Sequence, residues 1–170
     1  MNPFSHIYFL DANFFVDEAR ALLIAERLIA RWPNVSWSAS ASVRTIVANK
    51  QLFVQCKSLG LRMLEVGIEA GVQRILDQYN KNVTVEENLS ALQFLNKIGL
   101  KIGLDYIMFS PDMTLQELRT NLEFLRLAAV TQVEPFDHFF SILILYPSVP
   151  IRMQLLKSYG LAVDSDVVPN

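Results

Sequence analysis

The sequence predicts an α/β protein, a partial parallel (β/α) barrel of about five strand-helix units. Short apolar runs alternate along the chain with longer segments of helical period. Helices of ten or more residues between strands require crossover connections, and these place the strands in parallel. The later apolar runs are apolar on both faces, which is typical of strands covered on both sides. A flat, doubly wound sheet satisfies the same pattern, so periodicity leaves barrel and open sheet as alternatives.

The apolar runs predict where the strands lie. Five are expected, at residues 6–10, 35–40, 61–66, 100–109 and 139–146. A closed barrel needs more strands than these. We therefore expect the first strand-helix unit of the barrel to be missing from this chain. Residues 1–160 are expected to form the partial barrel and residues 161–170 a C-terminal tail.

Helix start signals stand between the strands. Asp17 and Asn49 are candidate N-caps, and the pairs Thr84/Glu87 and Thr114/Glu117 have the spacing of a capping box. Helices are expected at residues 17–30, 49–59, 71–79, 84–97, 114–129 and 150–159.

Composition excludes several classes of protein. Of the 170 residues, 52% are hydrophobic and 19% charged, which is a globular rather than a disordered composition. The formal net charge of −2 gives no electrostatic reason to expect nucleic acid as a partner. The longest apolar run, residues 139–146, is far short of the roughly 20 residues that span a bilayer. One cysteine excludes an internal disulfide, so we expect a cytoplasmic protein.

Polar side chains follow the predicted strands at their carboxyl ends, where ligands of parallel α/β folds bind. Carboxylates at these ends would bind ammonium and hydroxyl groups, and an arginine would hold a carboxylate by two hydrogen bonds. A zwitterionic ligand with a ribose would suit such a set. The candidates are Asp11, Asn13, Ser40, Ser42, Arg44, Glu69, Ser110, Asp112, Tyr146 and Ser148.

Six segments, in order along the chain, resemble the core of radical S-adenosylmethionine (SAM) enzymes, especially the cobalamin-associated group. LRMLEVGIEAG resembles the fourth-strand pattern Gly-Ile-Glu-(Ser/Ala)-Gly of that family, and NKNVTVEENLSAL resembles the Asn-Lys-x-x-Thr-x-Glu run that follows it. The others are FLDANFFVDEARA, VSWSASASVRTI, IMFSPDMTLQEL and LILYPSVPIRMQL. Together they cover roughly residues 6–156 and correspond to the later part of the family's partial barrel.

The resemblance implies that SAM lies across the strand ends, in support of 5′-deoxyadenosyl radical chemistry. It implies Asp11 at the methionine amino group and Arg44 at the methionine carboxylate. It places Glu69 and the turn at Gly67 near the ribose, and Ser110 near adenine or substrate. Asn13 and Ser42 stand in the same strand-end turns and complete the predicted cofactor-binding set.

The sequence lacks the family's cluster-binding cysteines. The Cys-x3-Cys-x2-Cys loop that holds the family's [4Fe-4S] cluster is absent, and a cluster needs several thiolates. No residue is assigned as a metal ligand or as catalytic. We therefore expect that the chain alone does not cleave SAM and that an upstream polypeptide supplies the cluster-binding cysteines. The expected substrate is a small molecule. Ser110 and Met113 also replace the glycine and acid usual at the fifth-strand turn.

Other functions stay open at this stage. One is a non-catalytic remnant or nucleotide-binding module of the same fold. Another is an unrelated (β/α) enzyme with Glu69 or Asp11 as a general base. Structural roles also compete for single residues: Asp11 with Asn13 could form only an Asx turn, and Arg44 could be a solvated loop cation. Cys56 is expected in the core, and His6 and His138 at the strand starts are expected to be structural.

Overall fold

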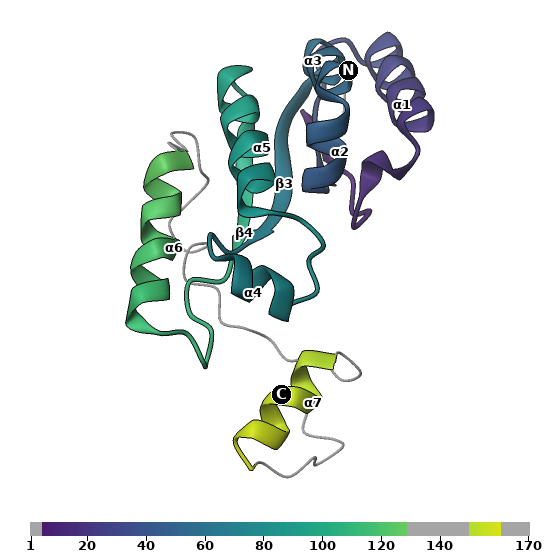
Figure 1. The fold of residues 1–170 in the computed structure, drawn as a ribbon. Helices are drawn as coiled ribbons and strands as arrows, with labels where there is room; N and C mark the ends of the chain where they lie inside the picture. Colours follow the sequence, from purple (N-terminus) through teal and green to yellow (C-terminus); the bar gives the residue numbers. More distant parts are fainter. Residues whose placement is uncertain (1–4, 129–149, 161–170) are drawn as a thin grey trace.

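The computed structural model describes residues 5–128 and 150–160 (Figure 1). Its sheet has four parallel strands in the order β1-β2-β3-β4, which confirms the predicted parallel α/β fold. The predicted fifth strand, residues 139–146, and the predicted tail lie outside the described residues. The strands are β1 (His6–Tyr8), β2 (Ser36–Ala41), β3 (Leu61–Glu69) and β4 (Lys101–Tyr106).

Helices connect each strand to the next. Neighbouring strands in space are also neighbours in sequence, as in a barrel wall and unlike a doubly wound sheet, whose order reverses. The helices are η1 (Phe14–Val16), α1 (Glu18–Arg31), α2 (Val43–Ala48), α3 (Lys50–Ser58), α4 (Gln73–Gln78), α5 (Val85–Lys97), α6 (Leu115–Ala128) and α7 (Pro150–Ser158).

The predicted caps are confirmed. Asp17 accepts a hydrogen bond from the Arg20 backbone N–H, and Asn49 caps α3. Thr84 and Glu87 form a complete capping box at α5. These contacts satisfy backbone N–H groups that have no partner inside a helix, and so fix where each helix begins.

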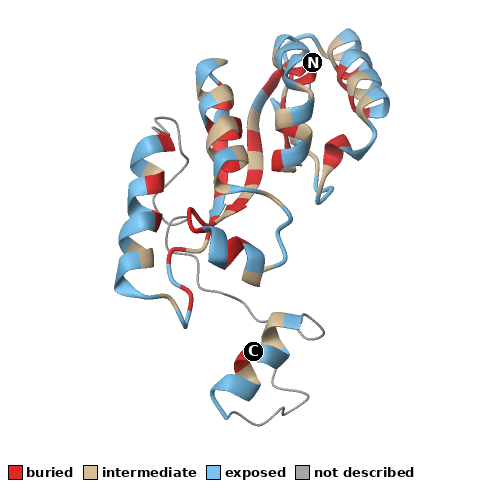
Figure 2. Cartoon of the chain, in the orientation of Figure 1, coloured by how far each residue is buried: buried red, intermediate tan, exposed pale blue. Residues whose placement is uncertain are grey.

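One face of the sheet is apolar and carries the core. Alternate residues of β3, among them Leu64, Val66 and Ile68, are buried with Phe53 of α3 and Leu92 of α5 in a single hydrophobic cluster. Figure 2 shows the buried residues gathered on the strands and on the helix surfaces beside them. This packing places α1, α2, α3, α5 and α6 on one side of the sheet.

The other face of the sheet is polar. Strand alternation places Ser40 and Glu65 on it, and the register pairs these two residues directly. Among the described helices, none is long and apolar enough to cross a membrane.

Candidate functional site

A cleft of about 730 Å³ lies at the carboxyl ends of the strands. This size falls within the range of about 300–1,000 Å³ usual for small-molecule sites. Five of the seven predicted cofactor-binding residues line the cleft: Asp11, Ser42, Arg44, Gly67 and Glu69. Asn13 and Ser110, the other two, are not among the residues that line it.

Glu69 is the last residue of β3 and has a left-handed backbone conformation, with φ of 63°. This conformation is unfavourable for a side chain other than glycine, asparagine or aspartate. The Glu69 side chain is only 15% exposed, and its carboxylate pairs with Lys81 Nζ at 2.5 Å. Strained residues of this kind persist where surrounding contacts hold them, and they concentrate at functional sites.

Buried hydrogen bonds hold the turn that carries Glu69. The Asn88 side chain on α5 donates to the carbonyl oxygens of Ile68 at 2.9 Å and Ala70 at 3.3 Å. The Ile107 N–H donates to the Glu69 carbonyl oxygen at 2.7 Å. Asn88 is fully buried, so these bonds form away from competing water.

A second buried group holds the far side of the same turn. The Gly71 N–H donates to Asn121 Oδ1 at 2.7 Å and to the Tyr106 hydroxyl at 3.1 Å. Tyr106 in turn donates to Asn121, and burial raises the pKa of the Tyr106 phenol above its usual value. The phenol therefore stays protonated and able to donate. Together with Asn88, these residues connect β4, α5 and α6 to the turn.

Arg44 contacts the loop between α4 and α5. Its guanidinium donates to the Asn82 carbonyl oxygen from Nε at 3.1 Å and from Nη2 at 2.6 Å. Asn82 is the residue after Lys81, so this two-pronged contact anchors the loop from which Lys81 reaches Glu69. Arg44 is thus engaged within the cleft and is not a purely solvated cation.

Asp11 and Ser42 also have partners inside the chain. Asp11 pairs with Arg20 at 3.2 Å, and both side chains are partly exposed. Ser42 accepts a hydrogen bond from the Thr45 N–H and caps α2, a short helix that the sequence pattern did not predict. The Asn13 side-chain oxygen is buried, with no hydrogen-bond partner among the described residues.

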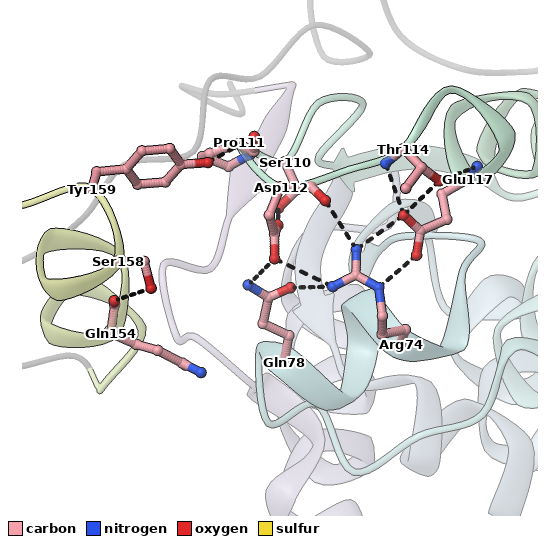
Figure 3. Close-up of polar contacts among 10 residues, drawn as sticks. All are labelled: Arg74, Gln78, Ser110, Pro111, Asp112, Thr114, Glu117, Gln154, Ser158 and Tyr159. Atoms are coloured by element: carbon pink, nitrogen blue, oxygen red, sulfur yellow. Dashed lines mark hydrogen bonds and ion pairs between the residues drawn. The ribbon is translucent and has the colours of Figure 1, made fainter.

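Ser110 belongs to a separate polar cluster on the turn after β4 (Figure 3). Its hydroxyl donates to Asp112, which also accepts from Gln78 and pairs with Arg74 at 3.3 Å. Arg74 pairs with Glu117 as well, at 2.5 Å. Both carboxylates of this cluster are thus paired with Arg74, which is typical of a structural network rather than a ligand site.

The same network shifts the pKa values of its carboxyls. The hydrogen bond from Arg74, followed by that from the Thr114 N–H, lowers the pKa of Glu117 to about 2. Burial alone would raise the pKa of Asp112, but hydrogen bonds from Ser110 and Gln78 outweigh it and lower that pKa. Tyr159 beside α7 donates to the Pro111 carbonyl oxygen at 2.9 Å, so α7 also contacts this turn (Figure 3).

The polar face of the sheet adds Tyr8 and Glu65, which the sequence pattern did not select, beside Ser40, which it did. Tyr8 and Ser40 both donate to Glu65 Oε2, Ser40 at 3.1 Å. All three line the cleft, as does Asp105 of β4. An acid between the apolar Leu64 and Val66, within a predicted strand, was the signal that could have identified this group.

The residues of the chain suit SAM and do not suit a [4Fe-4S] cluster. The cleft holds carboxylates for ammonium and hydroxyl groups and two cations for a carboxylate. Cys56, the sole cysteine, is buried, and burial raises the pKa of its thiol to about 12. Across residues 5–128 and 150–160, no cluster of histidine, cysteine and acidic side chains could hold a metal ion. His6 is structural as expected: its two ring nitrogens contact the hydroxyls of Ser36 and Ser38.

Comparison with known proteins supports the resemblance. The chain is 30% identical over 118 residues to an uncharacterized methyltransferase of Pyrococcus horikoshii, covering 69% of this chain and 25% of that protein. It is 26% identical over 137 residues to the 4′-phospho-dehydrooxetanocin synthase of Priestia megaterium, covering 71% of this chain and 18% of that protein. It thus spans at most about a quarter of the length of these relatives. No protein-family model matches the chain.

Solved structures agree on the fold. The cobalamin-dependent SAM radical enzyme OxsB, with aqua-cobalamin and SAM bound, covers 94% of this chain at a TM-score of 0.66 and 23% identity. The radical SAM methyltransferase TsrM from Kitasatospora setae, with cobalamin and a [4Fe-4S] cluster bound, covers 91% at a TM-score of 0.70 and 14% identity. The chain accounts for 23% and 29% of those two chains. The resemblance drawn from the sequence is therefore confirmed: this chain has the fold of part of the radical SAM enzyme core, as found in cobalamin-dependent members.

Proposed function

We propose that this chain is the SAM-binding part of a radical SAM enzyme core. The observation that carries the proposal is the convergence of Glu69, Lys81 and Arg44 with Asp11 in one cleft at the strand ends. These two acids and two cations, among the residues that line the cleft, match the ammonium, ribose hydroxyls and carboxylate of SAM.

Each cleft residue has a proposed part in binding. Glu69 accepts hydrogen bonds from the ribose hydroxyls, because its turn holds the carboxylate toward the cleft. Asp11 faces the methionine ammonium. Lys81 and Arg44 form the cationic rim that faces the methionine carboxylate, with Arg44 also anchoring the loop of Lys81.

The ligands of the [4Fe-4S] cluster are proposed to come from another polypeptide segment. The one thiol of this chain is buried and protonated, so cluster ligands would lie on a polypeptide segment outside these 170 residues. What the chain itself supplies is binding and orientation of SAM, while the cofactors supply the chemistry. Nucleotide binding without turnover is the second candidate, and the buried single cysteine favours it.

Calorimetric titration of the 170-residue chain with SAM tests the proposal. We expect a dissociation constant below about 1 mM, which corresponds to about −4.1 kcal/mol. Glu69→Gln should weaken SAM binding at least about tenfold, because a hydrogen bond to a charged group contributes roughly 1.5–3 kcal/mol. Glu86→Gln, the same charge change on an exposed position of α5, is the matched control. Absence of SAM binding at millimolar concentration would contradict the proposal.

A further inference from the structure

We propose that Asn88 is a positioning residue for SAM, because its side chain holds the turn at Glu69 in the conformation that directs the Glu69 carboxylate into the cleft. The inference rests on the proposed function, since SAM is the ligand that Glu69 is proposed to bind. Asn88 is not among the residues that line the cleft, so it would act only through the backbone that it contacts.

The backbone at Glu69 forms a γ-turn, a turn of three residues. The Ala70 N–H donates to the Ile68 carbonyl oxygen at 2.8 Å, and Glu69, the central residue, has a φ of 63°. A γ-turn whose central residue has a positive φ is rare and strained. The ladder between β3 and β4 also shifts register here, between Gly67 and Glu69. A strained turn at a break in the ladder needs contacts from outside the strand to persist.

One side-chain nitrogen of Asn88 bonds both ends of this turn. Nδ2 donates to the carbonyl oxygens of Ile68, at 2.9 Å, and of Ala70, at 3.3 Å, which lie before and after Glu69 in the chain. If Glu69 returned to a negative φ, the backbone on its two sides would rotate, and one nitrogen could no longer reach both carbonyls. Asn88 therefore favours the left-handed conformation of Glu69 over the ordinary one.

The other end of the Asn88 amide has no partner among the described residues. Asn88 is fully buried, and its Oδ1 accepts no hydrogen bond there. A buried polar atom without a partner is unfavourable for stability. The other buried positions of α5 are apolar: Ala91, Leu92 and Leu95. Packing alone would thus favour an apolar side chain at position 88, and the two donated bonds explain why an amide stands there.

The start of α5 determines where Asn88 faces. Thr84 and Glu87 form the capping box that fixes the first turn, and the Asn88 N–H donates to the Thr84 carbonyl oxygen at 3.0 Å. Positions four and seven residues further along a helix share its face, so Asn88 lies on the buried face with Leu92 and Leu95. The capping box thereby presents the Asn88 amide to the end of β3.

The γ-turn places the Glu69 carboxylate beside Gly67 and Lys81. Oε1 lies 2.5 Å from Lys81 Nζ, and a Cβ on Gly67 would lie 3.0 Å from the same oxygen. With a negative φ, the Glu69 Cβ would point in another direction, and the carboxylate would leave both neighbours. Loss of the Asn88 bonds should therefore move the carboxylate away from Lys81.

A zero-length crosslink measures the position of the carboxylate without any ligand. A carbodiimide should join Glu69 to Lys81 by an amide bond in the wild-type chain, because their charged groups are in contact. Asn88→Leu, similar in size but without a donor, should lower the crosslink yield at least about fivefold, as mapped by mass spectrometry. Leu95→Val, a core substitution on the same face of α5, should leave the yield within about twofold. No crosslink in the wild type, or an equal yield in Asn88→Leu, would overturn the proposal.

SAM titration of a double-mutant cycle separates positioning from general destabilisation. Asn88→Leu and Glu69→Gln should each weaken SAM at least about tenfold, and the double variant should bind within about twofold of Glu69→Gln alone. The reason is that Asn88 acts on SAM through the Glu69 carboxylate, which Glu69→Gln already removes. Additive losses in the double variant would show that Asn88 affects the cleft as a whole, and would overturn the proposal.

Two further measurements keep the test independent of how Asn88→Leu folds. Asn88→Asp, an isosteric change that removes the amide donor, should lower the crosslink yield as Asn88→Leu does. In the wild-type chain, the side-chain amide protons of Asn88 should exchange with solvent at least about a hundredfold more slowly than those of exposed Asn34. Equal exchange would overturn the proposal. A crosslink that depends on Asn88 in a chain that does not bind SAM would support the placement of Glu69 by Asn88 while contradicting the proposed function.

Discussion

The Cα of Gly71 packs directly against the side chain of Phe124, so closely that a Cβ atom on Gly71 would overlap the Phe124 Cβ and Cγ. This contact joins the turn after β3 to α6. Beside it, the Gly71 N–H reaches Asn121, one helical turn before Phe124. The residue at position 71 must therefore lack a side chain for the turn of Glu69 to close on α6.

Gly71→Ala is expected to destabilise the chain by about 1–3 kcal/mol, the usual cost of overpacking a filled core. Urea unfolding followed by circular dichroism measures it. The double variant with Phe124→Gly should cost less than the sum of the two single variants, because glycine at position 124 lacks both the Cβ and the Cγ that the new methyl group would overlap. Strict additivity would show that the Gly71–Phe124 contact is not the cause.

Glu69→Gly should be more stable than Glu69→Ala by roughly 1 kcal/mol. Both variants lack the carboxylate, but only glycine adopts the left-handed conformation at Glu69 without strain. Thermal melts of the two variants give the comparison, and SAM titration should show binding weakened about equally in both. A more stable alanine variant would contradict the strain at this position.

Lys81→Met should weaken SAM several-fold while leaving 5′-methylthioadenosine, which lacks the amino-acid carboxylate, within about twofold. The reason is that Lys81 is proposed to face that carboxylate from the loop that Arg44 anchors. Titration of both ligands against the variant and the wild type measures the loss of affinity for each ligand. Equal weakening of both ligands would indicate that Lys81 acts only through Glu69.

The stabilising contribution of Glu117 should depend on pH between about 4.5 and about 2. The folded pKa of Glu117, about 2, lies below the ordinary glutamate value of 4.5, because Arg74 and then the Thr114 N–H hydrogen-bond its ionised form. The folded state therefore binds fewer protons in this window than the unfolded state. The contribution is complete above pH 4.5 and is lost as the pH falls toward 2.

Melting temperatures of the wild type and Glu117→Gln across pH 2–7 check this dependence. The difference between the two proteins should be largest above pH 4.5 and shrink on acidification, and added salt should reduce it, since the pair with Arg74 is partly exposed. Glu123→Gln provides a comparison, because Glu123 pairs with Arg126 three residues away on the exposed side of α6. A pH-independent difference at Glu117 would contradict the ion pair as the source of stability.

Local signals in the sequence predicted much of the fold. The Asp17 cap and the Thr84/Glu87 capping box depend on residues three positions apart, and both formed where expected. The helix at Val43–Ala48 was missed because its cap, Ser42, was assigned to ligand binding instead.

The sequence predicted the site residues at the strand ends but not the contacts between side chains on neighbouring strands. Five of the seven predicted cofactor-binding residues line one cleft, because parallel strands end together at one edge. Ser110 instead joins Asp112, Arg74 and Glu117, a grouping that depends on how α4 packs beside the turn after β4. Tyr8 and Glu65 are 57 positions apart in the chain, and their contact follows from sheet register, which no local pattern specifies.

Iron and sulfide reconstitution of the 170-residue chain alone should yield no [4Fe-4S] absorption in the visible range. Cys56 is the sole cysteine, and burial keeps its thiol protonated, with a pKa raised to about 12, whereas cluster ligands are thiolates. The same burial should protect Cys56 from Ellman's reagent in the native state and expose it in denaturant. Cys56→Ala serves as the control for both measurements. If the wild-type chain alone gains cluster absorption and Cys56→Ala does not, the assignment of Cys56 to the core is contradicted. If absorption appears only after a polypeptide with Cys-x3-Cys-x2-Cys is added, a cluster-binding segment outside these residues is supported.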